Sequence, residues 1–395
     1  MEVMVETCCG IDVHQKSITC CILDGPLDTA KPKKVIRTFG TRTFELREAL
    51  SWMIDHGVTD LFMESTGQYW VPVFNIFSDS DIHQMLCNAE HVKNVPGRKT
   101  DVKDAEWLAQ LGRVGLLRSS YIPTPEVGQL RLLTRRRKAY GQKLTQTKNE
   151  MHNILQRGNI KLTSFLSDIY GTTGLRLIEL FVDGEVLTLE RVEACRHGRV
   201  KASAEDLLLA MDGKLSFNDR FLLSESLEEF YFYTKKVNRI KAVIKEYALQ
   251  YFPLEYGLLQ KIPGINEESA AVILGEIGPN VEAFESAGHL ASWAGLSPGS
   301  YESAGKSYSS RTTRGNKYLK SALVTSGGIA GNSRDRPFSY KYHVVFQRTG
   351  KKLLARVACA HKLIRIIYKV LNEKVEYNAE RALGLRQQHK SSIQN

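Results

Sequence analysis

GIDVHQKS (Gly10 to Ser17) brings an apolar stretch to one aspartate, Asp12, and then to a polar turn. The apolar pattern resumes at once in SITCCIL (Ser17 to Leu23). The segment therefore predicts two strands joined by a tight turn, with a carboxylate near the end of the first. A charge on a buried strand is costly unless it is paired or bound to a metal, so Asp12 is expected to have partners elsewhere in the chain.

Strand and helix patterns alternate around this hairpin over residues 1–120. Alternation of this kind predicts an α/β domain with a central sheet. The strand patterns are KVIRTFGT (34–41), DLFMEST (60–66) and DIHQMLCNA (81–89), and the helix patterns are TFELREALSWMIDHG (43–57) and DVKDAEWLAQLGRVGLL (101–117).

Helical patterns dominate residues 121–254. The segment 124–155 is long, basic and only roughly of coiled-coil period, so it predicts a helical arm, a dimer seam, or both. Residues 160–250 are expected to be mostly helical, with a less regular part at 179–213. The sequence alone does not choose between the two roles of the arm.

A mainly helical domain is expected over residues 255–375. LLQKIPGINEESAAVILGEIG (258–278) predicts helix, Pro-Gly turn and helix. This is either a helix-hairpin-helix that offers N–H groups to a nucleic-acid phosphate, or a plain pair of helices. Residues 296–315 are rich in Gly and Ser and predict an exposed loop, and a basic helix is expected near 353–375. Residues 376–395 are expected to be a flexible tail.

The charge of the chain favours a polyanionic partner. The 395 residues carry a net charge of +11, and their pI is near 9.2. Residues 131–161 contain nine Lys or Arg and one acid, and residues 303–372 contain fifteen and one. Nucleic acid and an anionic membrane surface both fit such a balance. A solvated face is the usual interpretation of a charge run, but two long stretches almost free of acid favour it less.

Targeting and redox signals in the sequence are weak. No run of about 18 apolar residues predicts a transmembrane helix, and MEVMVETCCGID has no signal-peptide plan, so a cytoplasmic location is expected. The seven cysteines form no CxxC pair, and four of them lie in the strands around Asp12. They are expected to be reduced thiols of the core.

Three further acids are candidate partners for Asp12. Glu64 ends a predicted strand, and Asp101 and Asp104 lie three residues apart at the start of a predicted helix. Four converging carboxylates repel one another, and a hard divalent cation such as Mg²⁺ or Mn²⁺ relieves that repulsion. Singly, each acid also has an ordinary role, as a turn residue, a helix N-terminal acid or the partner of a lysine.

These residues carry a resemblance to a known family. GIDVHQKS, FMESTGQYW and HVKNVPGRKTDVKDAEWLAQL resemble the DEDD transposases of insertion sequences, the class that includes the Piv and MooV DNA recombinases. IPGI…GEIG and ASWAGLSP…SAGKSYSSRTTRGNKYLKSAL are similar to the C-terminal transposase domain of that family. The resemblance covers about residues 5–118 and 255–372.

The resemblance implies a fold and a catalytic set. The N-terminal domain would be RuvC-like, of the RNase H type, with a Mg²⁺-binding tetrad of Asp12, Glu64, Asp101 and Asp104. It also implies a serine nucleophile in the Gly/Ser loop, best matched by Ser303, although Ala304 departs from the family pattern. Ser300 and Ser307 therefore stay open as alternatives.

The resemblance further implies nucleic-acid partners. These are donor and target DNA together with a noncoding bridging RNA, bound by homodimers that pair into a tetramer. The active site is built within one chain or between two. The candidate nucleic-acid-binding residues are Arg131, Arg135, Arg136, Arg137, Lys138, Lys306, Arg311, Arg314 and Lys317.

The sequence thus favours a site-specific DNA transposase and recombinase. A RuvC-like nuclease or resolvase that cuts by metal-activated water shares the tetrad but leaves the serine without a role. An ATPase of the actin and sugar-kinase type would need small Gly/Thr residues in the first hairpin, which GIDVHQKS lacks. A non-catalytic nucleic-acid scaffold leaves four acids in a basic domain unexplained.

Overall fold

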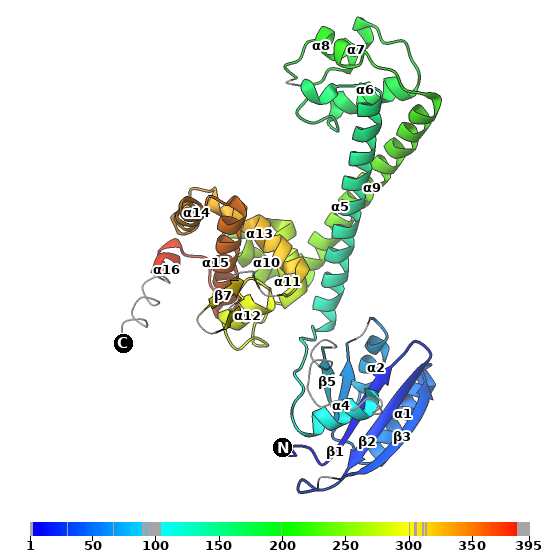
Figure 1. The fold of residues 1–395 in the computed structure, drawn as a ribbon, viewed down its shortest axis with the longest axis vertical. Helices are drawn as coiled ribbons and strands as arrows, with labels where there is room; N and C mark the ends of the chain where they lie inside the picture. The colour runs from blue at the N-terminus through cyan, green and yellow to red at the C-terminus, as the bar shows by residue number, and fades with distance from the viewer. Residues whose placement is uncertain are drawn as a thin grey trace. The chain divides into compact units, whose positions relative to one another are not determined.

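The computed structural model describes residues 3–29, 31–65, 67–88, 92, 104–198, 200–299, 301–303, 306–309, 312 and 314–384. The chain forms two compact units, residues 1–122 and 123–395. The first contains a sheet flanked by helices, and the second is mainly helical (Figure 1). Within the described residues, no helix is both long and apolar enough to cross a membrane.

The first unit is built on a five-stranded mixed sheet in the order β3-β2-β1-β4-β5. The first three strands pair antiparallel, while β4 is parallel to both β1 and β5. This is the strand order of an RNase H-like domain, and the predicted α/β domain is confirmed. The strands are β1 (Thr7–Val13), β2 (Ser17–Asp24), β3 (Lys33–Gly40), β4 (Asp60–Glu64) and β5 (His83–Cys87).

Helices cover both faces of this sheet. Helices α1 (Thr43–Asp55) and α2 (Trp70–Phe77) pack on one face, and α4 (Asp104–Arg113) packs on the other. Neighbouring strand residues alternate between the faces, so Cys9 joins the core under α1 and α2 while Cys8 joins the core under α4. All seven cysteines of the chain are buried and unpaired, as predicted.

The second unit begins with a long antiparallel helix pair, α5 (Pro125–Arg157) and α9 (Phe217–Tyr251). The Thr124 side chain caps α5, and Pro125 follows as its first residue. Hydrogen bonds join the two helices at both ends of the pair. The Tyr247 hydroxyl donates to the Glu126 carbonyl at one end, and Arg157 donates to the Asp219 carboxylate at the other. The predicted long helix is confirmed.

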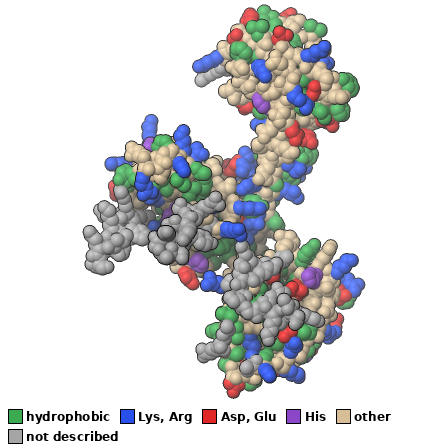
Figure 2. Space-filling model, in the orientation of Figure 1, with side chains coloured by type: hydrophobic (Ala, Val, Ile, Leu, Met, Phe, Trp, Pro, Cys, Tyr) green, Lys and Arg blue, Asp and Glu red, His purple; other side chains and the backbone are tan. Residues whose placement is uncertain are grey.

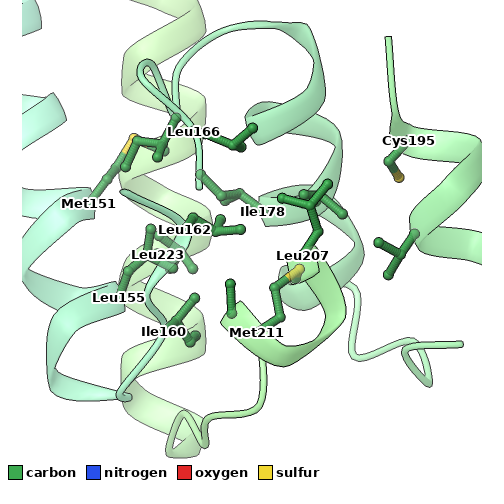
Figure 3. Close-up of a cluster of buried hydrophobic side chains, with 14 of the residues drawn as sticks. Met151, Leu155, Ile160, Leu162, Leu166, Ile178, Cys195, Leu207, Met211 and Leu223 are labelled. Carbon is green, nitrogen blue, oxygen red and sulfur yellow. The ribbon is translucent and has the colours of Figure 1, made fainter. Parts of the chain in front are cut away.

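A small helical cluster fills the chain between α5 and α9. It contains α6 (Thr172–Val182), α7 (Leu189–Cys195), α8 (Ala204–Ala210) and a short 3₁₀ turn at Leu162–Ser164. Its core includes side chains from both long helices, such as Met151, Leu155 and Leu223 (Figure 3). The less regular segment is therefore a packed end of the arm.

The C-terminal part contains helices and one short hairpin. The helices are α10 (Pro253–Gln260), α11 (Glu267–Ile277), α12 (Ala287–Trp293), α13 (Lys317–Gly331), α14 (Arg336–Thr349), α15 (Lys352–Glu373) and α16 (Ala379–Gly384). The hairpin, β6 (Tyr301–Ser303) and β7 (Lys306–Ser309), lies where only a loop was predicted. Two tyrosines, Tyr301 and Tyr308, favour strands there, but the Gly and Ser around them weaken the strand pattern.

Candidate active site and nucleic-acid surface

Two parallel strands bring two carboxylates to one edge of the sheet. Ile11 of β1 pairs with Met63 of β4, so the next residues, Asp12 and Glu64, lie at the same level near the ends of neighbouring strands. Phe62 packs in the core under α4, and side chains two apart on a strand share a face. Glu64 therefore lies on the face that α4 covers.

Helix α4 begins over this edge and brings a third carboxylate. A Cβ atom on Gly10 would lie 2.1 Å from the Ala105 carbonyl oxygen and 2.5 Å from the Ala109 nitrogen. Only a glycine lets the helix backbone approach β1 so closely. Gly10 and Asp12 share a face, and α4 starts at Asp104, one residue before the contact. The first turn of α4 therefore lies near Asp12.

Asp12 interacts electrostatically with the other two acids. The Asp12 side chain is 29% exposed, and burial raises the pKa of its carboxyl above the ordinary value. The negative charges of Asp104 and Glu64 raise that pKa further. Like charges that oppose ionisation are the signature of acids sharing one site.

His14, which the sequence analysis did not single out, pairs with Asp12. Its Nε2 atom lies 3.1 Å from Asp12 Oδ2, and the imidazole lowers the pKa of Asp12, partly offsetting the effect of burial. The spacing of two residues across the turn is the signal that could have identified it. The His14 side chain is 68% exposed.

The donor chemistry of this edge fits a hard divalent cation. Carboxylate oxygens are the ligands that Mg²⁺ and Mn²⁺ prefer, and a cation relieves the repulsion that raises the pKa of Asp12. In the part of the chain that the structure describes, no three His, Cys, Asp or Glu side chains stand close enough together to hold a metal ion. Asp101, the fourth predicted acid, lies outside the described residues.

The predicted nucleophile lies on the β6–β7 hairpin. Ser303 ends β6, and its backbone pairs with Lys306 at the start of β7, which also contains Ser307. The bridge between Pro298 and Thr312 extends this pairing toward the base of the loop. Ser300 and Arg311 lie outside the described residues. The hairpin and the acids belong to different units of the chain.

Three of the five candidate arginine and lysine residues at the start of α5 are turned toward α11. Arg131 donates to the backbone carbonyls of Gly275 and Glu276 at 2.8 and 2.9 Å. Arg135 makes two hydrogen bonds of 2.8 Å to the Glu276 carboxylate, and Arg137 pairs with Glu268. These guanidinium groups hold the arm to α11.

The other candidate cations are arranged differently. Arg136 is exposed, and its guanidinium lies 5.6 Å from the centre of the Tyr140 ring. Lys138 and Lys317 lie 5.0 and 5.4 Å from the centre of the Tyr318 ring. Arg314 is exposed. Further Lys and Arg side chains lie on the visible face of the α5–α9 stem and over α14 (Figure 2).

Burial and a neighbouring cation lower the pKa of Lys138. Burial is the larger cause, and the positive charge of Lys317 adds to it. Lys138 borders a cavity of about 580 Å³ that is lined by residues of α5, α11 and α13, and Lys138 and Lys317 both lie over the Tyr318 ring. An anion between them would remove the repulsion.

The turn between α10 and α11 does not form an open phosphate-binding site. Gly264 has φ of +85°, and a Cβ there would lie 2.4 Å from the Ser326 carbonyl oxygen of α13. The Asn266 side chain accepts from the Ser269 backbone, and Glu267 and Glu268 follow in the first turn of α11. Two acids at a helix N-terminus disfavour an anion, so the turn packs as a plain helical hairpin.

Glu276 is a buried charge that the sequence analysis passed over. It lies on α11, is 0% exposed, and accepts hydrogen bonds from Arg135 and from the Asn316 side chain. The sequence feature that could have identified Glu276 is a single acid within the apolar run ILGEIG. An acid in such a run is expected to be buried, and a buried acid needs cationic partners. Those partners are on α5, about 140 residues earlier in the chain.

Comparison with known proteins gives matches along both parts of the chain. A family model described as transposase, of the IS110 DEDD type, matches residues 9–160, and one described as transposase IS116/IS110/IS902 family matches residues 256–343. The insertion element IS110 uncharacterized 43.6 kDa protein of Streptomyces coelicolor is 29% identical over 130 residues, which are 32% of this chain and 31% of that protein. The pilin gene-inverting protein of Moraxella bovis is 34% identical over 118 residues, 29% of this chain and 36% of that protein.

These alignments span about a third of the length of each curated relative. The two family models are more extensive. The first contains all four predicted acids, and the second contains Glu276 and the β6–β7 hairpin. The chain therefore belongs to the IS110 family of DEDD transposases.

Proposed function

We propose that this chain is a site-specific DNA transposase and recombinase of an insertion sequence. The observation that carries the proposal is the placement of Asp12, Glu64 and Asp104 around one edge of the sheet, where the negative charges of the other two acids raise the pKa of Asp12. Several acids gathered at one edge of a sheet are typical of a site that binds a cation.

The acids would hold Mg²⁺ or Mn²⁺. The ligands are Asp12, Glu64 and Asp104 of the described residues, with Asp101 as the fourth. A bound divalent cation would polarise a phosphodiester and offset the negative charge that develops at phosphorus. His14 would give up its contact with Asp12 as the cation binds.

Ser303 is the proposed nucleophile. Its Oγ atom forms a bond to phosphorus as the bond from phosphorus to one deoxyribose oxygen breaks. The serine gives up its hydroxyl proton and the departing sugar oxygen gains one, so the number of phosphate ester bonds is unchanged. A sugar hydroxyl of the new partner strand reverses the step, and rejoining therefore needs no ATP.

Nucleic acid would be bound by exposed and partly exposed cations of the second unit. Arg136, Lys138, Arg314 and Lys317 are the described candidates, with Lys306 and Arg311 on the serine loop. Arg131, Arg135 and Arg137 serve mainly to hold α5 to α11. The partners are donor DNA, target DNA and a bridging RNA that supplies sequence recognition by base pairing.

The proposed assembly is a homodimer that pairs into a tetramer. Residues 1–120 form the catalytic DEDD domain, 121–254 the arm and dimer region, and 255–375 the serine domain. The segment 376–395, expected to be a flexible tail, contains a helix, α16, in which Ala382 is buried. The acids and the serine lie in separate compact units, which is compatible with a site built within one chain or between two.

A metal-dependent nuclease is the second candidate. The first unit, with its acids on a sheet edge, needs no serine to cut DNA through an activated water molecule. Such an enzyme releases free ends, whereas serine attack leaves DNA joined to protein.

A trapping experiment separates these two functions. Full-length protein, Mg²⁺, donor DNA and the RNA that flanks the element are combined, and the products are analysed by denaturing gel and peptide mass spectrometry. The expected result is a DNA–protein adduct on Ser303 that is lost in Ser303→Ala and in Asp104→Ala. Cleaved DNA with free ends and no adduct would establish the nuclease, and an adduct on Ser300 or Ser307 would move the nucleophile. Full activity of Asp104→Ala would refute the tetrad.

A further inference from the structure

Glu276 joins three separate segments of the second unit. Its carboxylate receives two hydrogen bonds of 2.8 Å from Arg135 of α5, and Arg131 Nε lies 3.6 Å away. The Asn316 side-chain nitrogen, at the start of α13, donates to the same carboxylate at 2.7 Å. Glu276 is 0% exposed, so water does not compete for these contacts.

The helices around Glu276 are held in close contact. A Cβ on Gly275 would lie 3.1 Å from the Arg131 nitrogen, so the α11 backbone lies directly against α5. The Glu276 carboxylate raises the pKa of Arg135 through its hydrogen bond, which holds the guanidinium in its charged form. Breaking such a pair leaves a buried charge without compensation, which fixes the position of α11 on α5.

Asn316 closes the loop that carries the hairpin. Its backbone N–H donates to the Trp293 carbonyl at 3.1 Å, and a Cβ on Gly315 would lie 2.3 Å from the Gly295 nitrogen. The two ends of residues 296–315 therefore meet. The Asn316 side-chain oxygen also caps α13 by accepting from the Tyr318 and Leu319 backbones at 3.0 and 3.1 Å.

We propose that Glu276 is a positioning residue that fixes the base of the serine loop, through Asn316, to the basic end of α5. One face of the Asn316 amide caps α13 and the other reaches Glu276, so the loop cannot shift without breaking a buried, charge-assisted hydrogen bond. Arg135 also lies 4.4 Å from the centre of the Tyr318 ring, which adds a second contact between α5 and the start of α13. The inference rests on the proposed function, because it gives the loop a catalytic role.

A charge exchange tests the link. Asn316→Asp keeps the helix cap, because Asp is a good N-cap residue, but it cannot donate and it faces a like charge. Adding Glu276→Gln to the same protein restores the hydrogen bond in the reverse direction, because the amide at position 276 now donates to the carboxylate at position 316. The double variant has the same net charge as wild type. Single-turnover rates of adduct formation at saturating DNA are measured for wild type, both single variants and the double variant, together with the Kd for DNA.

Each single variant is expected to lower the rate by about tenfold to a hundredfold, the scale of a misplacement of roughly 1 Å, with Kd unchanged within about twofold. The double variant recovers most of the rate. Glu255→Gln is the matched control, since Glu255 is 15% exposed and pairs at 2.7 Å with Lys374, at the C-terminal end of α15. Wild-type rates in both single variants, or a double variant no better than the worse single one, would overturn the proposal.

A second readout does not depend on catalysis. Amide hydrogen exchange of residues 293–316 is compared in the same four proteins, and Asn316→Asp is expected to speed exchange there, with recovery in the double variant. If wild type forms no adduct, the proposed function fails, while exchange still decides whether Glu276 holds the loop. Unchanged exchange in both single variants would refute that role.

Discussion

Gly10→Ala is predicted to damage both the stability of the first unit and the chemistry at its edge. The added Cβ would lie 2.1 Å from the Ala105 carbonyl oxygen and 2.5 Å from the Ala109 nitrogen, and real Cβ atoms essentially never come closer than 3.0 Å to such atoms. These are backbone atoms of α4 that cannot rotate away. The helix has to move outward from β1 by about 1 Å.

The cost follows from that displacement. Overpacking a close contact costs about 1–3 kcal/mol, against which Ala gains about 0.4–1 kcal/mol by restricting the unfolded chain. For a unit of this size, a net loss of roughly 1–2 kcal/mol lowers the melting temperature by about 4–8 °C. Because Asp104 begins the displaced helix, a shift of about 1 Å is expected to slow strand cleavage by roughly a hundredfold.

Thermal unfolding and the single-turnover rate of adduct formation measure the two effects. Gly112→Ala is the matched control, because its Cβ would meet the Phe62 ring at 2.2 Å near the other end of α4. Gly112→Ala is expected to lower the melting temperature by a similar amount but to reduce the rate of adduct formation less than Gly10→Ala does. A Gly10→Ala protein with the stability and rate of wild type would refute the reasoning, and so would an equal loss of rate in Gly112→Ala.

Three further outcomes are expected. Since the pKa of Asp12 is raised, its charge opposes folding at neutral pH. Asp12→Asn should therefore raise the melting temperature in EDTA at pH 7.5 and abolish the gain in stability that wild type shows as pH falls toward that pKa. Arg136→Gln should weaken nucleic-acid binding and reduce the slope of log K against log salt by about 0.7–0.9, measured by titration at several salt concentrations; an unchanged slope would exclude a phosphate contact. Burial, Arg365 and Lys341 lower the pKa of His361, so the folded protein resists its protonation. Stability should fall as pH drops below about 6.5, and a melting curve series should show a smaller fall in His361→Gln.

The sheet was predictable because its signal is local. Successive strand residues, such as Cys8 and Cys9 or Leu61 and Phe62, point into the cores on opposite faces of the sheet. Both faces are therefore apolar, and the strands appear in the sequence as continuous apolar runs typical of buried strands. The position of Asp12 near the end of such a strand identified it as a candidate before any contact was known. The other two acids followed from strand and helix ends in the same way.

Partners far apart in the chain were not predictable. The run from Arg131 to Lys138 is an electrostatic footprint by composition, yet three of its arginines are bound by α11, whose acids and carbonyls lie more than 130 residues later. Nothing in the local sequence identifies Gly10 as the contact point of α4. The sequence pattern around a strand glycine is the same whether a helix or solvent covers it.

The antiparallel pair of α5 and α9 sets a fixed distance between the structures at its two ends. Helix α5 contains 33 residues, and at 1.5 Å each it is a rod about 50 Å long. Its first turns are held against α11 at Gly275, and its last turns are part of the core that α6 to α8 complete. Adding seven residues to both α5 and α9 would therefore carry that core about 10 Å further out while leaving the contacts at each end intact. The arm can change length between related elements without a change in either end that it separates.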